Sequence, residues 1–118
     1  MNKITTEERK GREIKFRAWN NSKAVEKMLP WDFIKRLHMD EIVGRPNLNV
    51  MQFTGLHDKN GVEVYEGDIV KRFITNGNET GIVKYTPAYF YIEGSVKMDS
   101  TFMYEIIGNI YQNPELLK

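Results

Sequence analysis

Residues 51–70 read MQFTGLHDKNGVEVYEGDIV, and this stretch decides the fold. Two extended segments flank Asn60-Gly61, and this pair favours a type I′ hairpin turn because Asn and Gly tolerate positive φ best. Gly67-Asp68 predicts a second turn, since Gly adopts positive φ freely and Asp hydrogen-bonds its own backbone. The tract therefore predicts a tight hairpin followed directly by another strand.

Downstream of this tract, short apolar segments continue to alternate with turn residues. The predicted strands are 69–74, 81–85, 89–92 and 102–107, with turns at 76–78 and Gly94, a bulge or bend at Gly108 and a closing helical turn over 113–117. Such a series favours an antiparallel barrel or sandwich. We therefore expect a mostly β fold, all-β or α+β with one short helix, in which antiparallel strands form a small, partly open barrel-like domain.

Upstream of the tract, residues 14–19 alternate between apolar and charged side chains. This period is that of a half-buried strand, so Lys15 and Arg17 are expected to face water and Phe16 to face the core, together with Ile14 and Ala18. Segment 25–49 is less regular. Pro30 suits the first turn of a helix, and apolar spacing near i, i+3 predicts a helix over 30–39 that cannot continue through 44–46.

Length and composition suit one domain. The chain has 118 residues, of which 41% are hydrophobic and 28% are charged, which is typical of a globular protein. We expect a flexible N-terminal segment over 1–11 and a single β domain over 12–118. The absence of cysteine excludes disulfides and thiolate chemistry and fits a reducing compartment. No apolar run approaches the length that crosses a bilayer, so no membrane partner is expected.

Motifs for catalysis are absent from the sequence. There is no nucleophile elbow, Walker A loop or dinucleotide fingerprint, which disfavours the well-known enzyme classes, so no catalytic residues and no cofactor are predicted. His38 and His57 lie far apart without metal-ligand spacing, and no metal site is predicted. The carboxylates Glu63, Glu66 and Asp68 cluster, but turn formation and solvation explain them without chemistry.

Basic residues interleaved with aromatic residues are the remaining functional hint. Small barrels bind single strands by combining a basic groove with stacking aromatics. The candidate nucleic-acid-binding residues are Lys71, Arg72, Lys84 and Arg17. The formal net charge of +1 lends this no independent support. The run formed by Tyr85 and residues 89–91 suggests instead a protein interface or self-association, with Tyr89 and Tyr91 on one face and Phe90 on the other.

Several of these segments together resemble the YopX family of phage and prophage proteins. The central motif is LHDKNG at 56–61 followed by YEGDIV at 65–70, and it is flanked by IKFRAW at 14–19 and by IGNIY at 107–111 with Asn113-Pro114 and Leu116-Leu117. His57 stands where the family more often has Lys. The resemblance implies a mainly β fold and a phage-encoded protein in the cytoplasm of a bacterial host. It brings no catalytic residues with it.

Three functions follow as hypotheses. The first is a non-enzymatic phage accessory protein that binds an unidentified macromolecule or associates with itself as a homo-oligomer. The second is a small barrel that binds nucleic acid. The third is an enzyme that uses Glu66 or Asp68.

Overall fold

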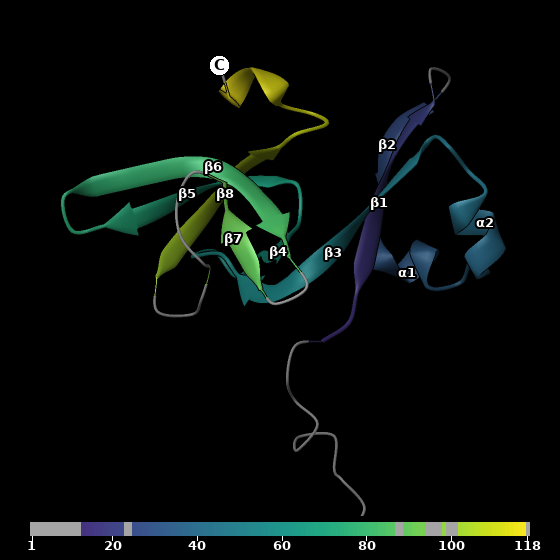
Figure 1. Cartoon of the computed structure of the whole chain (residues 1–118), viewed down its shortest axis with the longest axis horizontal. Helices are drawn as coiled ribbons and strands as arrows, with labels where there is room; N and C mark the ends of the chain where they lie inside the picture. The colour runs from purple at the N-terminus through teal and green to yellow at the C-terminus, as the bar shows by residue number, and fades with distance from the viewer. Residues whose placement is uncertain (1–12, 23–24, 87–88, 94–97, 99–101, 118) are drawn as a thin grey trace, which may run out of the picture.

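Most of the described chain is antiparallel β-structure in two four-stranded sheets (Figure 1). The computed structural model describes residues 13–22, 25–86, 89–93, 98 and 102–117. The first sheet has the order β2-β1-β3-β4 and the second has the order β7-β6-β5-β8. The strands are β1 Phe16–Ser22, β2 Val25–Leu29, β3 Leu48–His57, β4 Glu63–Tyr65, β5 Asp68–Ile74, β6 Gly77–Tyr85, β7 Phe90–Ile92 and β8 Met103–Asn109. The predicted fold class is confirmed.

The predicted hairpin is formed by β3 and β4, but its turn type differs from the prediction. Phe53 lies opposite Tyr65, and His57 lies opposite Glu63. Among the described residues positive φ occurs at glycines alone, so Asn60 does not adopt the conformation that a type I′ turn needs. Instead, the Gly61 amide donates to the carbonyl of Asp58 at 3.0 Å, and Gly61 takes φ of 81°. The type I′ prediction was therefore wrong, while the hairpin is confirmed.

Gly67 makes the second predicted turn, and the structure shows that this turn links the two sheets. Its φ is 88°, its amide donates to the carbonyl of Val83, and its carbonyl accepts from Ile110. A β-carbon at this position would lie 3.1 Å from the sulfur of Met51. This residue therefore needs both the conformational freedom and the small size of glycine.

We expect Gly67→Ala to lower the free energy of unfolding by about 2–4 kcal/mol, because it adds overpacking to the cost of a left-handed backbone. Gly61→Ala is the matched control, since its φ of 81° is similar but nothing lies within 4 Å of the added carbon. That variant should lose only the backbone share, about 1–2 kcal/mol. Urea denaturation of the two variants measures the difference, and equal losses would show that the contact with Met51 costs nothing.

The segment between β2 and β3 contains two short helices instead of the predicted single one. α1 spans Trp31–Ile34 and α2 spans Met39–Val43, so the helix predicted over 30–39 was wrong in its extent. The amides of Arg36 and Leu37 donate to carbonyls three residues back, which tightens the chain, and the extended backbone of His38 then separates the helices. α2 ends at Gly44, where a break was predicted. β2 itself was not predicted.

The first sheet is covered on both faces. On one face, Ala18 and Leu29 pack against Ile34 of α1. On the other face, Trp19 and Met51 pack with side chains that include Tyr65 and Tyr111 from later in the chain. β1 also lies between β2 and β3 in the sheet. Both faces and both edges of this strand are therefore covered, and its charged residues do not all face water.

This two-sided burial overturns the predicted orientation of the charged residues in β1. The side chain of Arg17 is 15% exposed and that of Lys15 is also largely covered, whereas Ile14 is exposed. The alternating pattern correctly placed Ala18 in the core. It could not show that the opposite face would also be covered, because that cover comes from β4 and from the C-terminal segment.

The second sheet is curled like half a barrel (Figure 1), and its inner face holds the largest apolar cluster of the described residues. The strands predicted in this region are present, as is the closing turn, a 3-10 helix at Pro114–Leu117. However, β6 begins at Gly77, so the turn predicted at 76–78 lies instead at residues 75–76. Ile69 pairs with Gly108 and Val70 with Ile106, so a bulge lies at the predicted place. Phe90 points inward while Tyr89 is exposed, as expected. The turn at Gly94 and the segment 1–11 lie outside the described residues.

Candidate functional site

An apolar groove lies between α1, α2 and the outer face of the first sheet. It encloses about 300 Å³ and is lined by Phe16, Trp31, Ile34, Lys35, Leu37, Met39, Ile42 and Val50. Met39 is 74% exposed although it lines the groove, and Val50 from β3 is also exposed. Apolar side chains left open to water beside an apolar hollow are typical of interaction sites. Sequence reasoning did not find this groove.

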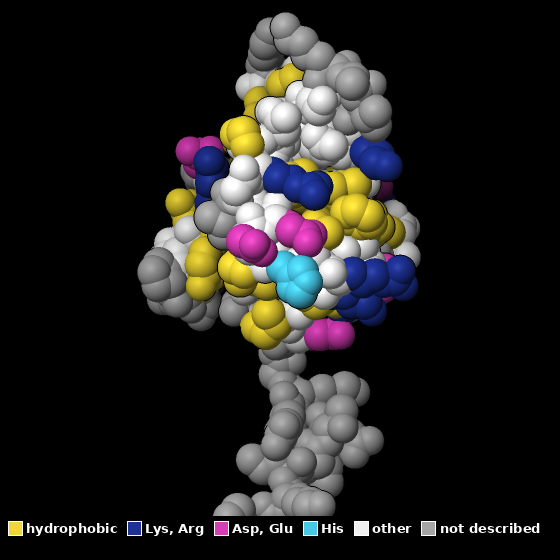
Figure 2. All heavy atoms as spheres, turned by 90° about the vertical axis from the view of Figure 1, so that its right-hand side faces the viewer, with side chains coloured by type: hydrophobic (Ala, Val, Ile, Leu, Met, Phe, Trp, Pro, Cys, Tyr) yellow, Lys and Arg dark blue, Asp and Glu magenta, His cyan; other side chains and the backbone are white. Residues whose placement is uncertain are grey.

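The rim of the groove carries charges of both signs. Lys35 lines the groove, and its ammonium lies 3.2 Å from the carboxylate of Asp32. Arg36 is exposed on the same turn, and Asp40 is exposed on α2. Figure 2 shows this end of the molecule, where hydrophobic side chains reach the surface between basic and acidic ones. The surface is therefore amphipathic without being strongly charged.

Two of the four predicted nucleic-acid-binding residues are held in ion pairs. Arg72 is buried on the inner face of the second sheet, where two of its nitrogens donate to one oxygen of Glu79 at 3.1 and 2.7 Å and its guanidinium lies over the ring of Phe102. Arg17 donates to Asp68 at 2.5 Å and lies 4.5 Å from the ring centre of Tyr65. Both guanidinium groups thus have partners within the protein.

Lys71 and Lys84 lie together on the opposite, outer face of the second sheet. Lys71 in β5 pairs with Thr80 of β6, and Ile69 pairs with Ile82, so Lys84 continues the same row of side chains. Neither ammonium forms an ion pair with a described residue. The structure therefore brings Lys71 and Lys84 to one face and separates them from Arg17 and Arg72.

A cluster of charged and aromatic side chains joins β1 to the β4–β5 turn. Lys15 forms an ion pair with Glu63, which raises the pKa of Lys15. Burial, together with the nearby Glu63 carboxylate, raises the pKa of Tyr65 to about 12. A cleft of about 370 Å³ opens beside the cluster, between β4 and the start of α1. Both cations in the cluster are paired with carboxylates. The pair between Arg17 of β1 and Asp68 of β5 joins the two sheets.

The carboxylates singled out in the sequence have different environments. Asp68 is 1% exposed; burial raises its pKa, and the Arg17 guanidinium opposes that rise. Its second oxygen accepts from the Tyr65 amide at 2.8 Å. Glu66, by contrast, is half-buried and accepts from the Gln52 amide at 3.4 Å. The expectation that turn formation and solvation explain these carboxylates holds in part, because Asp68 shapes the turn but is not solvated.

The described part of the chain has neither a cluster of metal ligands nor a helix long enough to span a membrane. There, no group of three or more His, Asp or Glu side chains is placed to hold a metal ion. His38 precedes α2, and His57 ends β3 with its ring 5.8 Å from that of Phe53. The longest helix among these residues is α2 with five residues, so no described helix could cross a bilayer.

The fold and its surfaces define a small, mostly β protein in which a helical cap and an apolar groove lie at one end and a curled sheet at the other. The family model described as YopX protein matches residues 15–118, so the chain belongs to the YopX family. A crystal structure of protein EF1440 from Enterococcus faecalis is similar, with a TM-score of 0.56 and 24% identity over 92% of this chain and 100% of that chain. This likeness concerns the fold. No curated protein matches the chain.

Proposed function

We propose that this chain is a phage- or prophage-encoded accessory protein of the bacterial host cytoplasm that works by binding, and that its binding surface is the groove beside α1 and α2. Family membership supports the phage origin through the resemblance described above. The observation that carries the binding role is the groove itself, whose lining is apolar apart from Lys35. Water at such a surface is displaced favourably by an apolar partner.

The occupant that we propose is a second copy of this chain. In a two-fold symmetric dimer the same patch meets itself, so a suitable patch needs both a projecting side chain and a hollow to receive it. Met39 projects at the mouth of the groove, and Trp31 and Leu37 line the hollow. One copy's Met39 can thus enter the groove of the other, and the unbranched thioether adapts well to such a site.

The charges on the rim support the same occupant. A surface that pairs with itself requires both signs, because each cation on one copy must meet an anion on the other. The exposed Arg36, between the groove residues Lys35 and Leu37, and the exposed Asp40, next to Met39, provide the two signs. A uniformly basic or acidic rim would favour a partner of opposite charge instead.

Met39→Glu should convert the protein from a dimer to a monomer in sedimentation experiments, because a carboxylate would be buried without a partner at the interface. Met103→Glu is the matched control. Met103 is 57% exposed on β8 of the second sheet, so the same chemical change there should leave the dimer intact.

Two results would contradict this proposal. A native protein that sediments as a monomer at every concentration would exclude self-association. Equal effects of Met39→Glu and Met103→Glu would show that the copies meet at a surface other than the groove. Thermal unfolding of both variants establishes that each is folded.

A further inference from the structure

We propose that the outer face of the second sheet, formed by β5, β6 and β7, binds single-stranded nucleic acid. This face lies on the second sheet, away from the helical end that carries the groove (Figure 1), so the inference does not depend on self-association. The residues that carry it are Lys71, Lys84 and Tyr91, with Phe73 extending the row. Sequence reasoning found the two lysines but assigned Tyr91 to a protein interface instead of to their face.

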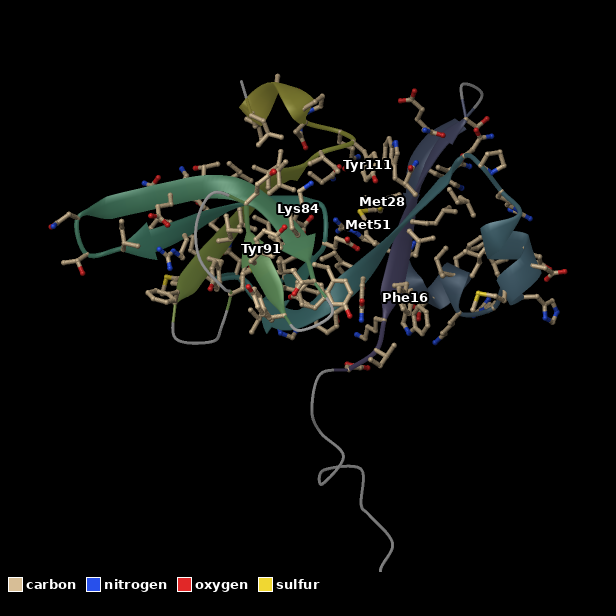
Figure 3. All side chains as sticks on the ribbon, viewed as in Figure 1. Phe16, Met28, Met51, Lys84, Tyr91 and Tyr111 are labelled. Carbon is tan, nitrogen blue, oxygen red and sulfur yellow. The ribbon has the colours of Figure 1, made fainter. Side chains whose placement is uncertain are left out.

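Strand register fixes this arrangement. Lys84 of β6 lies directly opposite Tyr91 of β7. Lys71 of β5 lies opposite Thr80, which is four residues before Lys84 on β6. Cross-strand partners project from the same face of an antiparallel sheet. Figure 3 shows Lys84 and Tyr91 close together on this sheet, far from Phe16 beside α1. A continuous row of side chains therefore runs from Tyr91 to Phe73.

The two lysines are available to an anionic ligand. Glu105 is the cross-strand neighbour of Lys71, but its carboxylate instead pairs with Lys59 at 3.3 Å. The ammonium of Lys59 also lies 5.2 Å from the ring centre of Phe73, but its charge is balanced by Glu105. The positive charge that this row offers to a ligand therefore comes from Lys71 and Lys84, in a chain whose net charge is only +1.

The spacing of cations and rings suits a single strand. By register Lys84 is displaced four residues from Lys71 along the strands, which corresponds to about 14 Å. Aromatic rings lie near both lysines, with Tyr91 packed edge-on against Tyr89 at 6.2 Å between ring centres. Cations that contact phosphates and rings that stack on unpaired bases are the two elements of sequence-tolerant single-strand binding. A duplex hides its bases from such rings.

Fluorescence anisotropy with labelled single strands of about 16 nucleotides tests this proposal, with DNA and RNA strands in separate arms. Titrations at about 50 mM and about 200 mM salt give the dependence of affinity on salt. The native protein should show a logarithmic slope of about −1.4, since each of two phosphate contacts on a single strand contributes about −0.7. The duplex of the same sequence should bind more weakly than either strand.

The variants separate the two elements of the site. Lys71→Ala with Lys84→Ala should bring the salt slope close to zero. Tyr91→Ala should weaken binding about tenfold at both salt concentrations, because stacking contributes energy without releasing counterions. The control double variant is Lys27→Ala with Arg45→Ala. It removes the same charge from two exposed positions, one on β2 and one in the loop before β3.

Several outcomes would overturn the proposal. Absence of binding at low salt would do so for both nucleic acids. Equal losses in the two double variants would reduce the effect to bulk charge. Tighter binding of the duplex than of the strands would contradict a stacking surface. A difference between the DNA and RNA arms identifies which nucleic acid the face prefers and leaves the chemistry of the site as proposed.

Discussion

Replacing Asp68 with alanine should destabilise the protein by about 3–5 kcal/mol, because it leaves the Arg17 guanidinium largely buried without its carboxylate. Domains of this kind are stable by only about 5–15 kcal/mol in total, so this loss would remove a large share of the stability. The loss also removes the acceptor of the Tyr65 amide. Urea denaturation followed by circular dichroism measures the effect.

A double variant that removes both charges of the pair should lose less stability than Asp68→Ala. In Arg17→Met with Asp68→Asn, neither partner is charged, and the asparagine carbonyl can still accept from the Tyr65 amide. The double variant should therefore be more stable than Asp68→Ala. Lys35→Ala is the surface control, since its ion pair with Asp32 is exposed and should be worth less than about 1 kcal/mol. Losses of similar size for Asp68→Ala and Lys35→Ala would disprove the role given to the buried pair.

Asp58→Ala should cost about 3 kcal/mol or more, since three backbone amides lose an ionised acceptor. One oxygen accepts from Asn60 and Val62 at 2.8 and 2.9 Å, and the other accepts from Ile106 of β8 at 3.2 Å. This carboxylate thus shapes the β3–β4 turn and fastens it to the second sheet. Asp58→Asn retains one carbonyl oxygen and should lose roughly half as much.

The same residue predicts a pH dependence. Burial would raise the pKa of Asp58, but the amides of Val62, Ile106 and Asn60 outweigh it and hold the pKa below the ordinary value of 3.8. Its contribution to stability is therefore complete above pH 3.8 and is lost as the pH falls through the lower folded-state pKa. Asp68 acts in the opposite direction because its pKa is raised. Asp58→Asn should flatten the acid limb of the stability profile, and an unchanged limb would exclude this assignment.

Local chemistry in the sequence was enough to predict the strands other than β2 and most turns. Gly61 and Gly67 mark turns because a positive φ is needed at each, and the alternation around Phe90 correctly predicted which side chain enters the core. These features depend on neighbours within a few residues. The exact turn at Asn60 was not predictable in this way, because the distant amide of Ile106 helps to set the position of the Asp58 side chain.

The candidate sites depend on contacts between distant segments, and sequence reasoning found them only in part. The local pattern predicted a solvated Arg17, but in the structure Asp68 of β5 forms an ion pair with it. Arg72 has the same local pattern as Lys71, yet alternation along β5 turns it to the inner face toward Glu79. The groove combines residues from two helices and two strands, so no single stretch of sequence carries its pattern.

The most direct test of self-association through the groove is an intermolecular paramagnetic relaxation experiment. The chain has no cysteine, so His38→Cys, at an exposed position between α1 and α2, provides a single site for a spin label next to the groove. The spin-labelled variant, prepared without isotope enrichment, is mixed with native protein enriched in ¹⁵N. We predict that amide signals of Leu37 and Val50 in the native copy broaden. Absence of intermolecular broadening, or broadening confined to the second sheet around Lys71, would contradict the proposal.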